Sequence, residues 1–302
     1  MAQAQAYPDR PVRIVVPFPA GGASGNIAQL LAQRLSAAYG ASFVLDYRVG
    51  SGGAIAGEHV AKSAPNGYTL LFATGALNIN DVLRKTKRYD FLKELDPIIE
   101  VAQAPFVMLV SPKLPVNNVR EFTAYARANP GKLNFGSGGL GAVTHLAGEM
   151  YKVAAGVDMV HVPFNGEAPA IVALMGEQVQ VEFMTLAASS GQIAARALKP
   201  LAVLSPKRSA LAPEVPTMLE EGVDVVATTW YALMAPAGTP VPIIERLNAE
   251  AAKALADPDL RGRITGMGAT PSGGPIAQLK DLILSDRVRW RKLSETTGIT
   301  LD

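Results

Sequence analysis

The stretch VRIVVPFPAGGASGNIAQLLAQRL, residues 12–35, decides the fold. Its first part, residues 12–17, is β-branched and ends at a proline, which is typical of a buried strand. Its last part opens a helical pattern over residues 27–39, with Ile27, Leu30 and Leu35 on one face. Glycine and other small residues lie between the two. A strand, a glycine-rich turn and a helix make up the first half of a βαβ unit.

The same alternation continues along the chain and predicts parallel sheets with helices on their faces. We expect further strands at 43–46, 68–73, 98–101, 106–110, 133–136, 159–162, 179–183, 201–204 and 228–235. We expect further helices at 54–64, 119–128, 144–153, 168–175, 191–197, 240–256 and 276–295. The sequence contains no internal repeat.

The chain has 302 residues, which is more than one ordinary core requires. The pattern predicts an α/β protein of two lobes, with two mainly parallel sheets flanked by helices. Lobe 1 is expected at 7–104 plus 226–302, and lobe 2 at 105–225. Two chain crossings between lobes make a hinge, so a cleft is expected between them.

Composition argues against several classes of function. The chain has 28 basic and 26 acidic residues, which lack the basic surplus of a nucleic-acid binder. No run approaches the ~18 apolar residues that span a bilayer. There is no cysteine, and no His, Asp or Glu cluster has metal-ligand spacing. Ser137 and His145 lack the G-x-S-x-G context of a nucleophile. We therefore expect no enzyme activity, no catalytic residue, no cofactor and no metal.

The beginning of the chain indicates export. Residues 1–6, MAQAQA, are small and polar, and Ala2, Gln3 and Ala4 fit the A-x-A pattern of signal-peptide cleavage. We interpret residues 1–6 as the remainder of a signal-peptide junction, which predicts a periplasmic protein. A disordered native N-terminus is the alternative.

The segment Pro17–Asn26 is a candidate anion site, because it joins the carboxyl end of a strand to a helix start. Glycine lets the backbone approach a ligand, and a helix N-terminus offers unpaired N–H groups. A tight turn capped by Ser24 or Asn26 is the structural alternative. A nucleotide site, with Asp46 as the ribose acid, is disfavoured because the spacing is not G-x-G-x-x-G.

Five further loops follow predicted strands, at 50–54, 73–78, 137–145, 163–169 and 184–189. Each offers hydroxyls, backbone N–H groups or one aromatic ring. Because carboxyl ends of parallel strands gather at one edge, these loops predict a cleft lined by neutral donors. Phe18 and Phe164 are candidates for stacking on a ligand, although core packing explains each equally well.

The sequence resembles the substrate-binding receptors of tripartite tricarboxylate transporters, often called Bug-type or TctC-like proteins. The resemblance covers nearly the whole chain after residue 6. It rests on YPDRPVRIVVPF at 7–18, AKSAPNGYTL at 61–70, ANPGKLN at 128–134, HLAGE at 145–149, VDMVHVPF at 157–164 and APAGTP at 235–240.

The resemblance implies a type II-like periplasmic binding protein fold that captures organic acids and delivers them to a permease of one large and one small subunit. We expect the receptor to act as a monomer, without nucleic-acid partners. It also implies that the loops 18–24 and 137–144 hold a ligand carboxylate, partly through water, and that Thr74 and Thr185 complete the pocket. The predicted ligand-binding residues are Phe18, Ala20, Gly21, Gly22, Ala23, Ser24, Thr74, Ser137, Gly141, Ala142, Val143, Thr144, Phe164, Asn165 and Thr185.

Two positions depart from the family pattern. Many members carry aspartate where this chain has Gly25, and a second frequent aspartate is replaced by Thr185. Fewer acids in a pocket favour a second ligand carboxylate, because a buried like charge is costly. We therefore expect a dicarboxylate, aliphatic or aromatic. An NAD-linked oxidoreductase and a sensor that signals to a kinase are the alternative functions.

Overall fold

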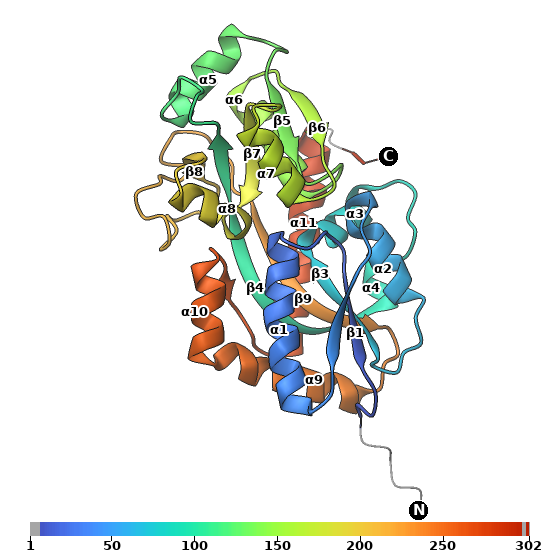
Figure 1. Cartoon of the computed structure of the whole chain (residues 1–302). Helices are drawn as coiled ribbons and strands as arrows, with labels where there is room; N and C mark the ends of the chain where they lie inside the picture. Colours follow the sequence, from blue (N-terminus) through green and yellow to red (C-terminus); the bar gives the residue numbers. More distant parts are fainter. Residues whose placement is uncertain (1–6, 298–299, 302) are drawn as a thin grey trace, which may run out of the picture.

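The computed structural model describes residues 7–297 and 300–301. Two α/β lobes lie one above the other, joined by long strands, and helices cover the faces of a curled sheet (Figure 1). This arrangement confirms the α/β class predicted from the sequence. The predicted signal-peptide junction at 1–6 lies outside the described residues. None of the helices in the described ranges is long and apolar enough to cross a membrane.

The first lobe is built around a central strand that runs parallel to both of its neighbours, and a further strand continues this sheet in the antiparallel direction. In sheet order these strands are β2 (Phe43–Tyr47), β1 (Val12–Val16), β3 (Thr69–Thr74) and β9 (Thr228–Pro236). On β1, Val12 and Ile14 face one apolar cluster, whereas Val15 faces another. The β-branched run in the sequence therefore places apolar side chains on both faces of the strand.

Helices far apart in the sequence supply these two apolar clusters. The first cluster contains side chains of α1 (Ala23–Tyr39), α9 (Val241–Ala256) and α10 (Pro258–Gly266). The second contains side chains of α2 (Ala54–Ala61), α3 (Gly75–Leu83), α4 (Phe91–Glu94) and α11 (Ile276–Thr297). The C-terminal helices thus pack on the lobe that the N-terminal strands form.

The second lobe repeats the layered plan with a smaller sheet. β5 (Asn134–Ser137) runs parallel to β6 (Val160–Pro163) and to β7 (Val181–Thr185), and β8 (Lys199–Val203) completes the sheet. One face is covered by α5 (Val119–Ala128) and α6 (Val143–Ala155), and the other by α7 (Glu167–Met175) and α8 (Leu186–Ala194).

One strand belongs to both sheets. β4 (Leu95–Val110) pairs antiparallel with β9 as far as Pro105, which lies opposite Thr228. From Phe106 onward it pairs with β7 and β8. The sequence predicted two separate strands here, because polar Gln103 and Pro105 interrupt the apolar pattern. The backbone nevertheless continues as one strand, since the pairing with β9 spans the interruption.

The structure also differs from the predicted elements elsewhere. α1 begins at Ala23, four residues before the predicted start, so the small residues of the loop form its first turn. α3 and α10 were not predicted as helices, and the short strand β10 (Thr270–Pro271), which pairs with β4, was also missed. In α3 the helical pattern is obscured because Asn78, Asn80 and Asp81 are buried alongside the apolar residues.

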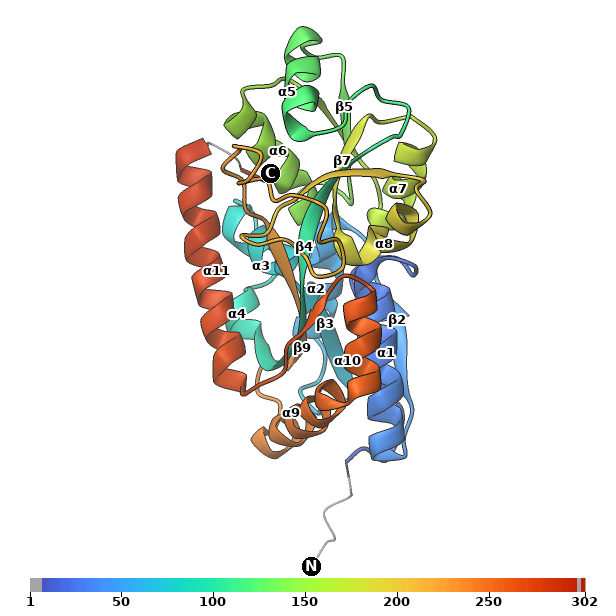
Figure 2. The same cartoon turned by 90° about the vertical axis from the view of Figure 1, so that its left-hand side faces the viewer.

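The C-terminal helix is not confined to one lobe. Figure 2 shows α11 running along one side of the molecule, from the level of α9 to the level of α6. Leu279 and Ile283 pack in the first lobe, whereas Trp290 shares an apolar cluster with residues of β4 and α6. Leu301 joins the same cluster and pairs with Arg84 after α3.

Candidate functional site

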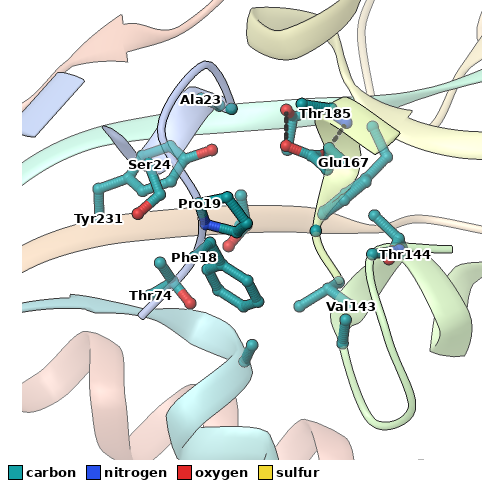
Figure 3. Close-up of a pocket in the computed structure, with 18 residues that line it drawn as sticks. Phe18, Pro19, Ala23, Ser24, Thr74, Val143, Thr144, Glu167, Thr185 and Tyr231 are labelled. Atoms are coloured by element: carbon teal, nitrogen blue, oxygen red, sulfur yellow. Dashed lines mark hydrogen bonds between the residues drawn. The ribbon is translucent and has the colours of Figure 1, made fainter. Parts of the chain in front are cut away.

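A cavity lies between the lobes, at the carboxyl ends of β3 and β7 and beside the loop that follows β5 (Figure 3). It leaves about 50 Å³ for the centres of water-sized molecules. Both lobes contribute to its lining, which comprises Phe18, Pro19, Gly22, Ala23, Ser24, Thr74, Ala76, Phe106, Gly138, Ala142, Val143, Thr144, Gly166, Glu167, Ala168, Thr185, Thr229 and Tyr231.

A larger cavity of about 340 Å³ also contacts both lobes, beside Gln103 and Thr228. Its cationic side chains, Lys207 and Arg208, are exposed, and Arg208 is paired with Glu220. The smaller cavity is the stronger candidate, because strand ends and two helix N-termini converge on it.

The wall from lobe 1 is formed by the loop before α1 and by the end of β3. Gly21 has φ of 90°, a conformation that glycine adopts readily, and Gly22 caps α1 without any side-chain hydrogen bond. Ser24 Oγ and Thr74 Oγ1 are buried and have no hydrogen-bond partner among the described residues. Since buried hydroxyls are normally satisfied, these two are available to a ligand.

The wall from lobe 2 is the loop between β5 and α6. Gly139 and Gly141 have φ of 132° and 77°, and Ala142 precedes α6 without a side-chain cap. Thr144 Oγ1 accepts a hydrogen bond of 2.8 Å from the Gly138 amide, which leaves its hydroxyl hydrogen free to donate. The first amides of α6 thus face the same cavity as those of α1.

A buried histidine pair supports this loop from behind. The rings of His145 and His161 stack with centroids 3.9 Å apart, and His161 Nε2 lies 2.6 Å from Ser137 Oγ. Burial, with the nearby charge of His145, lowers the pKa of His161 to about 3, so the ring is neutral at physiological pH. Ser137 has no exposed surface and does not line the cavity, so this contact holds the loop in place.

Glu167, the first residue of α7, connects the two walls. Its Oε1 accepts a hydrogen bond of 2.7 Å from the Thr185 amide, and its Oε2 accepts one of 2.9 Å from the Thr185 hydroxyl. The backbone amide of Ala23, which belongs to α1 in the opposite lobe, lies close enough to lower the pKa of this carboxyl group. Burial raises the pKa of Glu167 above its usual value, and these three donors oppose that rise.

The charge of the cavity lining is distinctive. Of the described residues that line it, none is a lysine, arginine or histidine, and Glu167 is the single carboxylic acid. The remaining polar groups are hydroxyls and helix amides. Within the described parts of the chain, no group of three or more His, Asp or Glu residues could hold a metal ion.

The structure brings nine of the fifteen predicted site residues to the cavity. These are Phe18, Gly22, Ala23, Ser24, Thr74, Ala142, Val143, Thr144 and Thr185. Ala20, Gly21 and Asn165 are exposed, Ser137 and Gly141 are buried beside the loop, and Phe164 packs on the apolar cluster under α7. The turn at Gly166, with φ of 109°, separates Phe164 and Asn165 from the cavity that Glu167 lines.

Sequence reasoning missed Glu167, Thr229 and Tyr231. The sequence identified the loop that contains Glu167, but Phe164 and Asn165 were predicted as its ligand-binding residues instead of Glu167. Thr229 and Tyr231 alternate along β9, so the period of two in that strand was a signal that could have placed both on one face. Asp46, the acid of the nucleotide alternative, pairs with Arg13 and Arg48.

Comparison with protein families gives a match over residues 27–299 to the tripartite tricarboxylate transporter family receptor. Among individual relatives, protein BugT of Bordetella pertussis is 35% identical over 301 residues, which cover 99% of this chain and 92% of BugT.

Solved structures agree with this match over the full fold. Rpa4515 of R. palustris, solved with adipate, superposes with a TM-score of 0.95 at 35% identity, covering 97% of this chain and 99% of that one. MatC of Rhodopseudomonas palustris, solved with bound malate, has a TM-score of 0.91 at 28% identity, covering 95% of this chain and 99% of that one.

Proposed function

The chain belongs to the tripartite tricarboxylate transporter receptor family, and from that premise we propose that it is a periplasmic solute-binding receptor that closes its two lobes on a small organic carboxylate. The observation that carries this proposal is the convergence of the α1 and α6 N-termini on one cavity, from opposite lobes. Helix N-termini bind anions through unpaired amides and the helix dipole. Ser24 and Thr74 add two hydroxyls that lack partners among the described residues.

The lobes proposed to close are 7–104 plus 226–302 and 105–225. Two pairing changes support these boundaries. β4 leaves β9 at Pro105 and joins β7 at Phe106, and β9 begins at Thr228. Both crossings are extended strands, which suit a hinge between the lobes.

The proposed ligand is a short aliphatic dicarboxylate. Relatives of this chain have been solved with adipate and with malate, which are both dicarboxylates. Of the two phenylalanines expected to stack on a ring, Phe18 lines the cavity and Phe164 does not. Phe18 and Phe106 give the cavity apolar surface on which an aliphatic chain can pack.

We further propose that the receptor acts as a monomer and delivers this ligand to a membrane permease of two subunits. The family description as a transporter receptor supports the delivery. The proposed route requires a signal peptide ahead of the mature chain.

Isothermal titration calorimetry with adipate and malate tests the proposed function. Ser24→Phe fills the cavity at the start of α1 and should lower affinity at least 100-fold, because the side chain of Ser24 faces the ligand space. Gln29→Ala, an exposed change on the same helix, should leave affinity unchanged. Circular dichroism checks that both variants fold. Failure of the wild type to bind any organic acid would overturn the proposal.

A further inference from the structure

Glu167 places a carboxyl group where the proposed function would put ligand charge. The group is anchored in lobe 2 by both donors of Thr185 and reaches the Ala23 amide of lobe 1. In Figure 3, Glu167 and Thr185 lie opposite Ala23 and Ser24, with Val143 and Thr144 further along the cavity. A ligand carboxylate at the start of α6 therefore leaves the other end of a short ligand near Glu167.

No cation on the cavity wall offsets the charge of Glu167. The described lining residues contain no lysine, arginine or histidine. The titratable groups around Glu167 are Glu182 of β7 and the hydroxyl of Tyr231 of β9, and on the α1 side the contact is the Ala23 amide. Burial raises the pKa values of Glu182 and Tyr231, so both are neutral at physiological pH.

We propose, resting on the proposed function, that Glu167 is a specificity-determining residue that binds the second carboxylate of a dicarboxylate ligand by sharing one proton with it. Two ionised carboxylates in one buried site repel each other strongly, so one of them takes up a proton. In the balanced step, the ionised Glu167, the ligand dianion and one proton from solvent form a complex of net charge −2. Glu167 and the ligand are joined in it by one O–H···O⁻ hydrogen bond.

The geometry permits this pair. Glu167 accepts two hydrogen bonds from Thr185, and its two oxygens offer about four acceptor positions when ionised. Positions therefore remain for a proton directed at the ligand. Burial, which already raises the pKa of Glu167, favours uptake of that proton. The nearby ligand carboxylate raises this pKa further in the complex.

The sign of the pH dependence follows from linkage. Above the pKa of Glu167 in the free protein, each dicarboxylate that binds takes up one proton. The dissociation constant should then rise up to about tenfold per pH unit. Below that pKa, Glu167 already carries the proton and affinity should not change with pH. His145 and His161 do not mimic this dependence, because burial lowers the pKa of both.

Calorimetry in buffers of different ionisation enthalpy measures the number of protons taken up when a ligand binds. We would titrate malate and adipate between pH 6 and pH 8.5. At pH values where Glu167 is ionised in the free protein, we expect uptake approaching one proton for the wild type. Glu167→Gln keeps the size and the acceptor for the Thr185 amide but carries no charge. It should abolish proton uptake, and it should bind malate more tightly than the wild type at pH 8.5.

Glu182→Gln is the matched control, because Glu182 is a buried acid of the same lobe that does not line the cavity. At pH 7 and below, where Glu182 is neutral, this change should leave proton uptake unchanged. Dicarboxylate affinity that is equal in the wild type and Glu167→Gln at every pH would overturn this inference alone, as would proton uptake that persists in Glu167→Gln. Tighter binding of aspartate than of malate, lost in Glu167→Gln, would also overturn it, because Glu167 would then pair with an ammonium group. Absence of binding for every organic acid would overturn the proposed function and this inference together.

Discussion

Glu182 lies in β7 with no exposed surface, and neither of its carboxyl oxygens has a hydrogen-bond partner among the described residues. Burial, together with the charge of Glu167, raises the pKa of Glu182 to about 9. The group is therefore neutral in the folded protein at pH 7, whereas it ionises in the unfolded chain above about pH 4.5. A neutral acid in an apolar layer is tolerated because its ionised form would cost far more.

This shift predicts how stability depends on pH. Between about pH 4.5 and about pH 9 the unfolded state loses a proton that the folded state keeps, so ionisation of Glu182 lowers the free energy of unfolding as pH rises. Glu182→Gln removes this effect. Thermal unfolding should show a melting temperature that exceeds that of the wild type by about 5 °C or more at pH 8, with little difference at pH 4. An equal difference at both pH values would contradict the assignment.

The sequence predicted where the candidate site lies better than it predicted the charge of the site. The loops were found because small residues after strands mark close approach of the backbone. The reasoning from Gly25 and Thr185 expected a pocket without an acid, yet Glu167 provides one from a different loop. Its hydrogen bonds to Thr185 join residues 18 positions apart, and such a contact has no local signal in the sequence.

At the scale of elements, one buried carboxylate fastens α11 to the hinge region. Asp286 accepts hydrogen bonds from the ring N–H groups of Trp230 in β9 and Trp290 in α11, at 3.2 and 2.9 Å. Asn78 of α3 and Arg289 donate to the same carboxylate. Three elements that are distant in the sequence thus depend on a single side chain.

Asp286→Ala should destabilise the protein strongly, because it leaves two buried indole N–H groups without an acceptor. Each unsatisfied donor costs about 1–3 kcal/mol. Urea unfolding should show a loss of at least about 2 kcal/mol. Asp281→Ala, an exposed change on the same helix, should stay within about 0.5 kcal/mol of the wild type. A loss in Asp286→Ala no larger than in this control would refute the proposed role of Asp286.

Elements with one regular hydrophobic pattern were predictable from the sequence. Elements that bury polar residues, or that pass from one lobe to the other, were not. β1 has a clear apolar run bounded by proline, and α5 has a clear amphipathic pattern, so the sequence placed both correctly. α3 was missed because its polar residues are buried and satisfied by tertiary contacts, including Asn80 with Gly52 and Gly141. β4 was divided in two because its surroundings change between the lobes at Pro105.

For the molecule as a whole, two kinds of contact join the lobes. Trp290 of α11 and Leu301 pack in the apolar cluster of lobe 2, whereas a few polar contacts and close approaches lie beside the cavity. Glu167 reaches the Ala23 amide, and the Asn80 amide group lies 3.5 Å from the Gly141 carbonyl oxygen. A Cβ atom on Gly166 would lie 2.8 Å from Pro19 across the cleft, so only glycine permits this approach. A ligand that binds beside these cavity contacts, and so touches both lobes, can shift an equilibrium between open and closed lobes.

Small-angle X-ray scattering with and without malate should therefore report a smaller radius of gyration for the liganded wild type. The reason is differential affinity, because only the closed form brings α1 and α6 to the same ligand. Ser24→Phe should show no ligand-dependent change, since its cavity is filled. A wild type that binds malate by calorimetry without any change in its radius of gyration would contradict closure. The ligand would then enter lobes that are already closed, and a path through the cleft would have to open only transiently.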